Sequence, residues 1–299
     1  MFRHQLVEEA VSILEENNYA TQMYSGSFDI AAKEKNILIL KVLLNVDSFL
    51  ENHAKDLKII SHGLGANTVV IGKQTRFERL KEGVVYERFD IPTLSVETFR
   101  SIIENKIYPE VFRDRGGSYV RIDSEAMRAA RKKKGLSQRE LGEMLSVNKK
   151  TVYEHEREEL RMFLETARNL ERVLEARLIR NDSLSRSYAE HGNPKDRLES
   201  SVGKALQRIG FQADYAGSSP FDILAISDDI VLSTVIREER IFIRKAEQLN
   251  SFSELIRRPR IAIAENSRER DILGVPVIDR KDLTGLNKRD FLKIAKESN

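Results

Sequence analysis

The residues from Ser137 to Glu156, SQRELGEMLSVNKKTVYEHE, combine two helix-start signals with a group of basic and polar side chains. Ser137 and Glu140 have the spacing of a capping box, in which a hydroxyl and a carboxylate accept hydrogen bonds from free backbone N–H groups at a helix start. Asn148 is a favourable N-cap for a second helix, and a Lys-Lys-Thr run would fill its first turn. Side chains placed in this way could contact phosphates and base edges of a nucleic acid.

Apolar residues in the same stretch fix how these two helices would pack. Leu141 and Leu145 are four residues apart and lie on one face of a helix, and Val152 of the next helix can cover them. The polar side chains then point outward. The spacing predicts a helix-turn-helix, and the alternative is an ordinary helical hairpin with a solvated face.

Residues 122 to 157 as a whole, IDSEAMRAARKKKGLSQRELGEMLSVNKKTVYEHER, resemble the DNA-binding domain of phage Cro/repressor-type regulators. They look most like the archaeal transcriptional regulators that carry this domain in mid-chain. The resemblance implies that Gln138 contacts a phosphate and that the second helix presents its outer side chains to base edges. The sequence departs from the family at Ser146, where the turn usually has glycine.

The resemblance implies a sequence-specific regulator that binds double-stranded DNA, and we expect a homodimer on an imperfect palindrome. The alternative is a DNA nuclease or resolvase-like enzyme guided by the helix-turn-helix. We expect no enzymatic activity and no cofactor. The predicted DNA-binding residues are Gln138, Arg139, Asn148, Lys149, Lys150, Thr151, Tyr153 and Glu154.

A second pattern recurs on either side of this motif. Residues 28–43, FDIAAKEKNILILKVL, and residues 221–236, FDILAISDDIVLSTVI, are identical at six of sixteen positions without a gap. The helices and strands predicted around them also recur, in the order helix, three strands, helix, strand and helix for the first copy. An internal duplication explains both observations, and chance agreement of two strand pairs is the alternative.

The order of elements in each copy, with Phe-Asp on the second strand, resembles the core of the restriction-endonuclease-like fold. Active members bind a divalent metal through this aspartate and a Glu-x-Lys on the third strand. Asp29 and Lys41 match in the first copy, but Ile39 replaces the glutamate. In the second copy Asp222 matches, whereas Leu232 and Thr234 replace the glutamate and lysine. One carboxylate is a poor set of ligands for Mg²⁺, so no metal site and no cleavage are expected.

These patterns predict two duplicated α/β arms around a central all-α helix-turn-helix domain. Gly116-Gly117 is expected to be a flexible joint before the motif. Apolar residues from Leu160 to Leu174 are expected to form a stripe on one long helix, which either closes the domain's core or makes a dimer contact. The predicted domains are residues 1–112, an arm; 113–181, the helix-turn-helix with its following helix; 182–197, a linker; and 198–299, the second arm.

Composition is compatible with this organisation. Residues 113–161 contain 13 Lys/Arg and 9 Asp/Glu, a net charge of +4, which leaves −1 for the rest of a chain whose total is +3. An excess of positive charge around the motif favours phosphate binding, although the run from Arg131 to Lys134 could be a solvated helix end. The chain lacks cysteine, and its first twenty residues lack a continuous apolar run. We therefore expect a cytoplasmic protein without a membrane partner.

Overall fold

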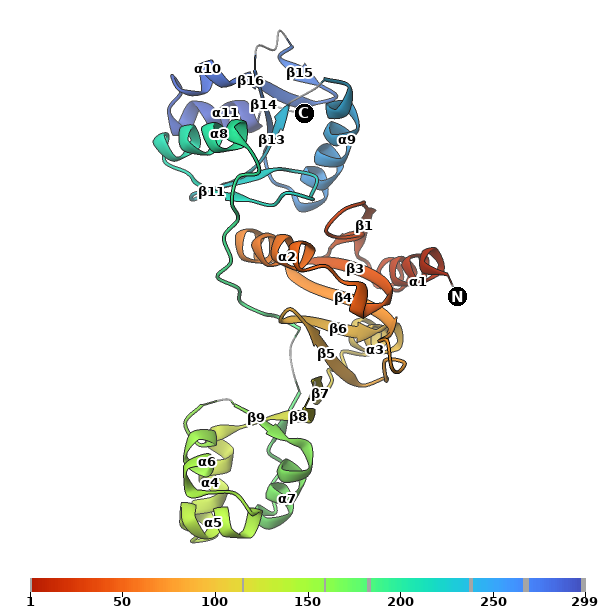
Figure 1. Cartoon of the computed structure of the whole chain (residues 1–299), viewed down its shortest axis with the longest axis vertical. Helices are drawn as coiled ribbons and strands as arrows, with labels where there is room; N and C mark the ends of the chain where they lie inside the picture. Colours follow the sequence, from red (N-terminus) through yellow and green to blue (C-terminus); the bar gives the residue numbers. More distant parts are fainter. Residues whose placement is uncertain are drawn as a thin grey trace.

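A computed structural model of the chain describes residues 2–114, 116–158, 160–181, 184–236, 239–265 and 269–296. Three parts follow one another along the long axis of the molecule (Figure 1). The helix-turn-helix region lies in the middle of the sequence but at one end of the structure. The first arm is therefore the central part in space, and the second arm lies at the other end.

The first arm is a mixed sheet with helices on both faces. Its strands have the order β1-β2-β3-β4-β6-β5, in which β3, β4 and β6 are parallel to one another. The bounds of its elements are α1 Arg3–Glu16, β1 Ala20–Met23, β2 Ile30–Lys33, β3 Ile37–Asn45, the 3₁₀ turn η1 Val46–Ser48, α2 Glu51–Leu64, β4 Asn67–Gln74, β5 Val84–Arg88, β6 Ile91–Ser95 and α3 Val96–Asn105. Strands β5 and β6 are additional to the predicted elements.

The second arm has the same arrangement of strands. Its sheet has the order β11-β12-β13-β14-β16-β15, with β13, β14 and β16 parallel. The elements are α8 Arg197–Arg208, β11 Gln212–Tyr215, β12 Ile223–Ile226, β13 Ile230–Ile236, α9 Glu239–Ile256, β14 Arg260–Ala264, β15 Asp271–Ile272, β16 Val275–Asp279, α10 Arg280–Leu283 and α11 Lys288–Lys296. Helix α9 and the β15–β16 pair were not predicted from the sequence.

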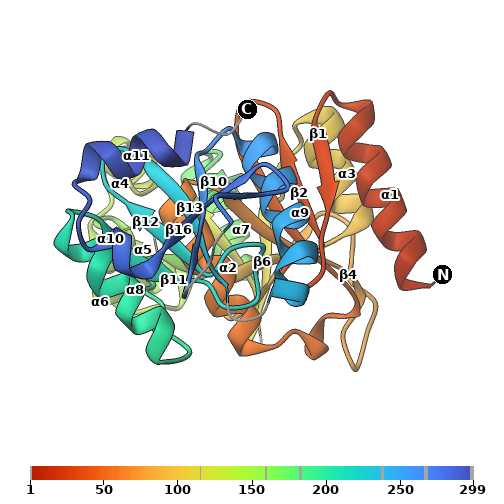
Figure 2. The ribbon, with the colours of Figure 1, turned by 90° about the horizontal axis from the view of Figure 1, so that it is seen from above.

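The two arms share one hydrophobic core. Helices α2 and α9 pack between the two sheets, and buried residues of both arms, including Phe28, Phe221 and Phe252, form a single cluster. Helices α1 and α3 cover the outer face of the first sheet and lie side by side in Figure 2. Helices α8, α10 and α11 cover the outer face of the second sheet. The arms are therefore one packed unit.

The helix-turn-helix region is not all-α, contrary to the prediction. Strand β7 (Val111–Asp114) pairs with β5 of the first arm, and β8 (Gly117–Ile122) pairs with β7, β9 (Arg161–Phe163) and β10 (Ile179–Arg180). The sheet of the first arm thus continues into this region. The predicted joint at Gly116-Gly117 is instead where β8 begins. Gly117 is the first residue of β8, pairs with Asp114 of β7 and has φ 139°, a conformation that favours glycine.

The helices of this region enclose a small core against β8 and β9. They are α4 (Ser124–Lys133), α5 (Gln138–Leu145), α6 (Lys149–His155) and α7 (Leu164–Leu174). The predicted apolar stripe is not on one long helix, because β9 interrupts it and Phe163 is exposed. Its remaining members on α7 are buried in the region's own core. This confirms the interpretation that the stripe closes the domain's core, and it leaves these side chains unavailable for a dimer contact.

The predicted linker has no helix or strand among its described residues up to Asp196, but it packs against the first arm. Leu184 is buried in the core beneath α1 and α3, and the Tyr188 hydroxyl donates a hydrogen bond to the carbonyl of Asp90. Burial raises the pKa of Tyr188 to about 12. This segment runs back along the first arm to reach the second arm (Figure 1).

Candidate nucleic-acid interface

Both predicted helix starts are present in the structure. The Ser137 Oγ accepts a hydrogen bond from the Glu140 N–H at 3.1 Å, and the Glu140 carboxylate accepts one from the Ser137 N–H at 2.7 Å. Asn148 Oδ1 accepts a bond from the Thr151 N–H at 2.7 Å and caps α6. Ser146 ends α5 with φ 56°, so a serine occupies the left-handed turn position that usually favours glycine. Leu141, Leu145 and Val152 pack together as expected.

The predicted DNA-binding side chains lie on the outer surface of α5 and α6. Lys149 and Lys150 are exposed at the start of α6, and Lys150 forms an i,i+4 ion pair with Glu154 at 3.6 Å. Arg139 is exposed on α5, where it pairs with Glu143 at 2.9 Å. Surface pairs of this type contribute little to stability, so the basic groups can exchange their partners for a phosphate or a base.

Three of the predicted residues have structural roles as well. Asn148 is the cap of α6, and the Thr151 hydroxyl donates to the same amide oxygen at 3.1 Å. Tyr153 is 44% exposed, and its hydroxyl accepts a hydrogen bond from Arg157, whose guanidinium also lies 5.3 Å from the ring centre. Arg157, just after the end of α6, thus adds a cation to the exposed face of this helix, and it was not among the predicted residues.

Gln138 is held in place by a buried ion pair. Its Nε2 donates to the Glu156 carboxylate at 2.7 Å, and Arg131 donates two hydrogen bonds to the same carboxylate at 2.5 and 3.0 Å. Burial alone would raise the pKa of Glu156, but the hydrogen bonds from Arg131 and Gln138 outweigh it and lower that pKa. The pair joins α4 to the end of α6, and it fixes Gln138 at the start of α5.

Arg131 is therefore not part of a solvated helix end. It is buried, whereas Lys132 and Lys133 beside it are exposed. The pairing of Arg131 with Glu156 could not be predicted, because Glu156 is 25 residues away and the pairing depends on how three helices pack. The spacing of Met127 and Arg131 on one face of α4 was the available signal, since Met127 is fully buried.

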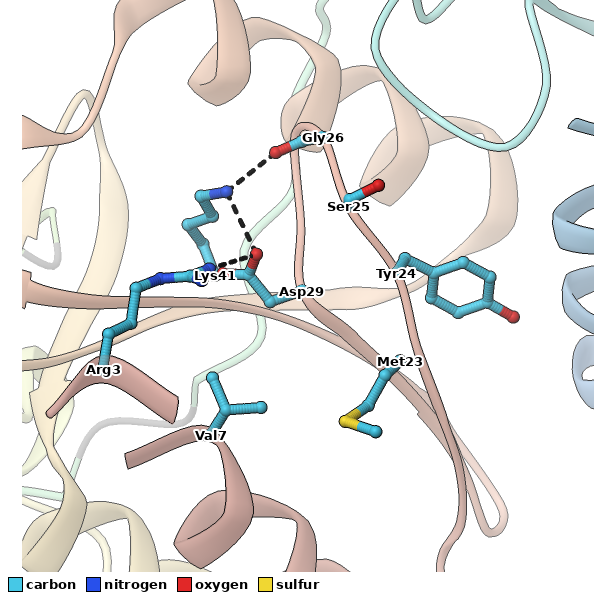
Figure 3. Close-up of a pocket in the computed structure, with 8 residues that line it drawn as sticks. All are labelled: Arg3, Val7, Met23, Tyr24, Ser25, Gly26, Asp29 and Lys41. Carbon is cyan, nitrogen blue, oxygen red and sulfur yellow. Dashed lines mark hydrogen bonds and ion pairs between the residues drawn. The ribbon is translucent and has the colours of Figure 1, made fainter. Parts of the chain in front are cut away.

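In the first arm, Asp29 and Lys41 lie together as the resemblance implies (Figure 3). Lys41 Nζ lies 3.2 Å from the Asp29 carboxylate and donates a hydrogen bond to the Gly26 carbonyl at 2.7 Å. Arg3 forms a second ion pair with Asp29 at 2.6 Å, and the Val42 N–H donates to its other oxygen at 2.7 Å. The cavity beside them has a volume of about 250 Å³.

The second arm repeats this arrangement with different cations. Asp222 is buried, accepts hydrogen bonds from the Thr234 hydroxyl at 2.7 Å and the Val235 N–H at 2.8 Å, and pairs with Lys245 at 2.5 Å. Thr234 and Val235 occupy the positions of Lys41 and Val42. Burial raises the pKa of Asp222, but the charge and hydrogen bond of Lys245 outweigh this and lower it.

Neither arrangement fits the divalent metal of active restriction-endonuclease-like proteins. Ile39 and Leu232, at the positions of the missing glutamate, are fully buried in the shared core. The aspartate of each arm is already satisfied by cations and a backbone N–H. Within the described ranges, no group of three His, Cys, Asp or Glu side chains is placed to hold a metal ion.

The loops next to the two aspartates join the arms. Asp56 on α2 accepts hydrogen bonds from the Ser27 hydroxyl at 2.5 Å and from the N–H groups of Gly217 and Ser218 at 3.1 and 3.0 Å. From the other arm, Ser251 on α9 lies 3.2 Å from the Tyr24 hydroxyl. Each arm thus contacts the loop of the other with its inner helix. The sequence indicated neither contact.

Known proteins resemble both the whole chain and its first arm. Residues 3–109 match the PD-(D/E)XK superfamily domain. A protein of Methanobrevibacter smithii named "Putative HTH-type transcriptional regulatory protein" is 32% identical over 99% of this chain and 97% of its own length. A protein of Methanothermobacter thermautotrophicus with the same name is 32% identical over 99% of this chain and 96% of its own length.

A further relative, from Thermococcus kodakarensis and also named "Putative HTH-type transcriptional regulatory protein", is 31% identical over 98% of this chain and 95% of its own length. No solved structure is significantly similar to the chain. None of the described helices is long and apolar enough to cross a membrane. On identity and coverage, the chain belongs to the family of these archaeal HTH-type regulatory proteins, with a PD-(D/E)XK domain at its N-terminus.

Proposed function

We propose that the protein is a sequence-specific transcriptional regulator that binds double-stranded DNA through α5 and α6. The observation that carries this proposal is the start of α6, where Asn148 caps the helix and leaves Lys149 and Lys150 exposed in its first turn. The membership in a family named for this role supports the same proposal.

The proposed contacts divide into two kinds. Gln138 and Arg139, at the start of α5, position the motif on the phosphate backbone, and the fixed geometry of Gln138 against Glu156 suits this role. Lys149 and Lys150 donate to the acceptors of guanine in the major groove, where lysine discriminates bases. Thr151, Tyr153 and Glu154 complete the surface of α6 that faces the DNA.

Single substitutions test this division of roles. Lys149→Ala or Lys150→Ala should cost about 1 to 3 kcal/mol on the preferred site and relax specificity there. Gln138→Ala should weaken binding to all sequences by similar amounts. Lys133→Ala, which removes an exposed positive charge from α4, is the control for charge alone. The measurement is affinity for a site selected from genomic DNA and for random DNA. Equal losses on both DNAs from both lysine variants would refute the assignment of base contacts.

The proposal includes a homodimer. One short recognition helix reads only a few base pairs, and such regulators gain affinity by placing two motifs on half-sites about 34 Å apart. The expected operator is an imperfect palindrome. Light scattering of the protein free and on DNA, together with a footprint, tests this. A monomer mass in both states with a footprint on one half-site would contradict it.

We further propose that the two arms are duplicated and do not cleave DNA. The identical strand orders and the matching surroundings of Asp29 and Asp222 support the duplication. Buried Ile39 and Leu232 in place of the metal-binding glutamate support the absence of cleavage. Supercoiled plasmid should stay intact with Mg²⁺ or Mn²⁺. Cleavage that Asp29→Ala abolishes would favour the alternative function, a nuclease guided by the helix-turn-helix.

A further inference from the structure

A cavity of about 800 Å³ lies where the first arm meets the helix-turn-helix region, away from the predicted sites. Its wall comes from η1, from the loop after β4, from β5 with its following turn, and from β7. Phe49 and Tyr86 are buried in this wall, while Phe77 is 90% exposed and Phe89 is 42% exposed. The volume is in the range of sites for small molecules, which combine aromatic walls with a few polar groups.

Four acids and three arginines line the cavity, and two of the acids pair with basic residues outside the lining, Arg161 and Lys58. Within the described ranges, the guanidinium of Arg76 has no acid within ion-pair distance, whereas each acid that lines the cavity has a basic partner. The hydrogen bond from the Arg76 backbone N–H to Asp47, at 2.6 Å, fixes where this residue lies in the wall. The ion pairs of the cavity's acids are Asp47–Arg88, Glu78–Arg113, Glu87–Arg161 and Asp90–Lys58.

The backbone at the edge of the cavity is strained. Phe89 and Asp90 form the two-residue turn between β5 and β6, and both have positive φ, at 51° and 63°. A hairpin turn of this shape favours Asn-Gly, and a bulky side chain rarely adopts it. The turn places the Phe89 ring edge-on against Phe49, with their centres 6.0 Å apart. Strain of this kind is often found where a ligand is held.

From these observations we propose that the cavity binds a small planar aromatic anion. Phe77 and Phe89 offer exposed ring faces on which a flat ring can stack, and the unpaired guanidinium of Arg76 can bind its anionic group. Free nucleotides and aromatic carboxylates share this chemistry. A bound molecule would contact β7, the strand that connects the first arm to β8.

Isothermal titration calorimetry of the full chain with two probes distinguishes these sources. AMP represents nucleotides and salicylate represents aromatic carboxylates, while adenosine lacks the charge and inorganic phosphate lacks the ring. At least one of the two anions should bind with a dissociation constant below 1 mM, on the order expected for a small ligand. Adenosine should bind about tenfold more weakly than AMP if AMP is the better ligand, and phosphate should not bind.

Two variants assign the binding to this cavity. Arg76→Gln should weaken it about tenfold through loss of a charge-assisted hydrogen bond, and Phe77→Ala about fivefold through loss of stacking. Both side chains are exposed, so neither change threatens the fold. Arg79→Gln, an exposed arginine that does not line the cavity, is the matched control. Absence of binding by both anions, or binding that Arg76→Gln and Phe77→Ala leave unchanged, overturns the proposal. DNA binding enters none of these measurements, so the outcome is independent of the proposed regulatory function.

Discussion

The buried ion pair beneath the recognition helix provides the sharpest test of how the helix-turn-helix is held together. Glu156→Ala removes the carboxylate that accepts hydrogen bonds from Arg131 and Gln138. The side chain of Glu156 is 2% exposed and that of Arg131 is 10% exposed, so the guanidinium would stay buried. Its other bond, to the Leu136 carbonyl, does not neutralise its charge. Breaking a buried pair from one side costs about 3 to 5 kcal/mol, and we expect a loss of that size.

The measurement is urea unfolding followed by circular dichroism. It compares the double variant Arg131→Met/Glu156→Leu with the single variants Arg131→Met, Glu156→Leu and Glu156→Ala. Apolar side chains of similar volume remove both charges together, so the double variant should lose less stability than Glu156→Ala alone. Lys134→Ala, which breaks the exposed pair with Glu175, is the control and should cost less than about 1 kcal/mol. A loss of stability below about 1 kcal/mol in Glu156→Ala would refute this reasoning. A loss in the double variant equal to the sum of the losses in Arg131→Met and Glu156→Leu would refute it as well.

The same pair gives a pH dependence with a defined sign. The pKa of Glu156 is lowered from its usual 4.5, so the folded state binds fewer protons at this site than the unfolded chain. The resulting stability is fully present above pH 4.5 and is lost as the pH falls through the folded pKa. The difference in stability between wild type and Glu156→Ala should therefore shrink below that pH. A difference that grows on acidification would contradict the assigned shift.

Three further results are expected. Asp56→Ala should destabilise the contact between the arms by about 2 to 3 kcal/mol, because it leaves the Gly217 and Ser218 N–H groups without their acceptor, and calorimetric unfolding measures this loss. Lys41→Met should cost about 2 kcal/mol, less than Glu156→Ala because Arg3 remains on Asp29, and the same calorimetry tests it. Specific DNA affinity should fall steeply with salt, and its logarithmic slope, measured by titration, should lessen by about 1 in Arg139→Ala, which removes a proposed phosphate contact. A slope unchanged in that variant would exclude a phosphate contact by Arg139.

Local signals in the sequence predicted the centre of the chain well. The caps at Ser137 and Asn148 act within three residues, so the starts of α5 and α6 follow from the sequence itself. The repeated Phe-Asp pattern also predicted the strands β2, β3, β12 and β13. The hydrogen bonds from the third strand of each arm to Asp29 and Asp222 arise within the hairpins formed by these strands, whereas the ion pairs from Arg3 and Lys245 come from helices.

Features that depend on distant parts of the chain were not predicted. The continuation of the sheet from β5 through β7 to β8 depends on parallel pairing across a long connection, which leaves no pattern in either strand. Helix α9 carries polar residues between its apolar ones, and its buried face becomes evident only once both sheets are placed against it. The pairing of Arg131 with Glu156 is missed for the same reason.

The packing of the arms limits how two chains could pair. Helix α2 contacts the loop after β11 through Asp56, and helix α9 contacts the loop after β1 through Ser251, so the two equivalent helices make reciprocal contacts. Such reciprocity is the property of an isologous dimer interface, here formed within one chain. The inner faces of both arms are buried in this contact. A homodimer that pairs two recognition helices must therefore use a different surface, and the helix-turn-helix region, at the end of the molecule far from the second arm (Figure 1), is free to provide it.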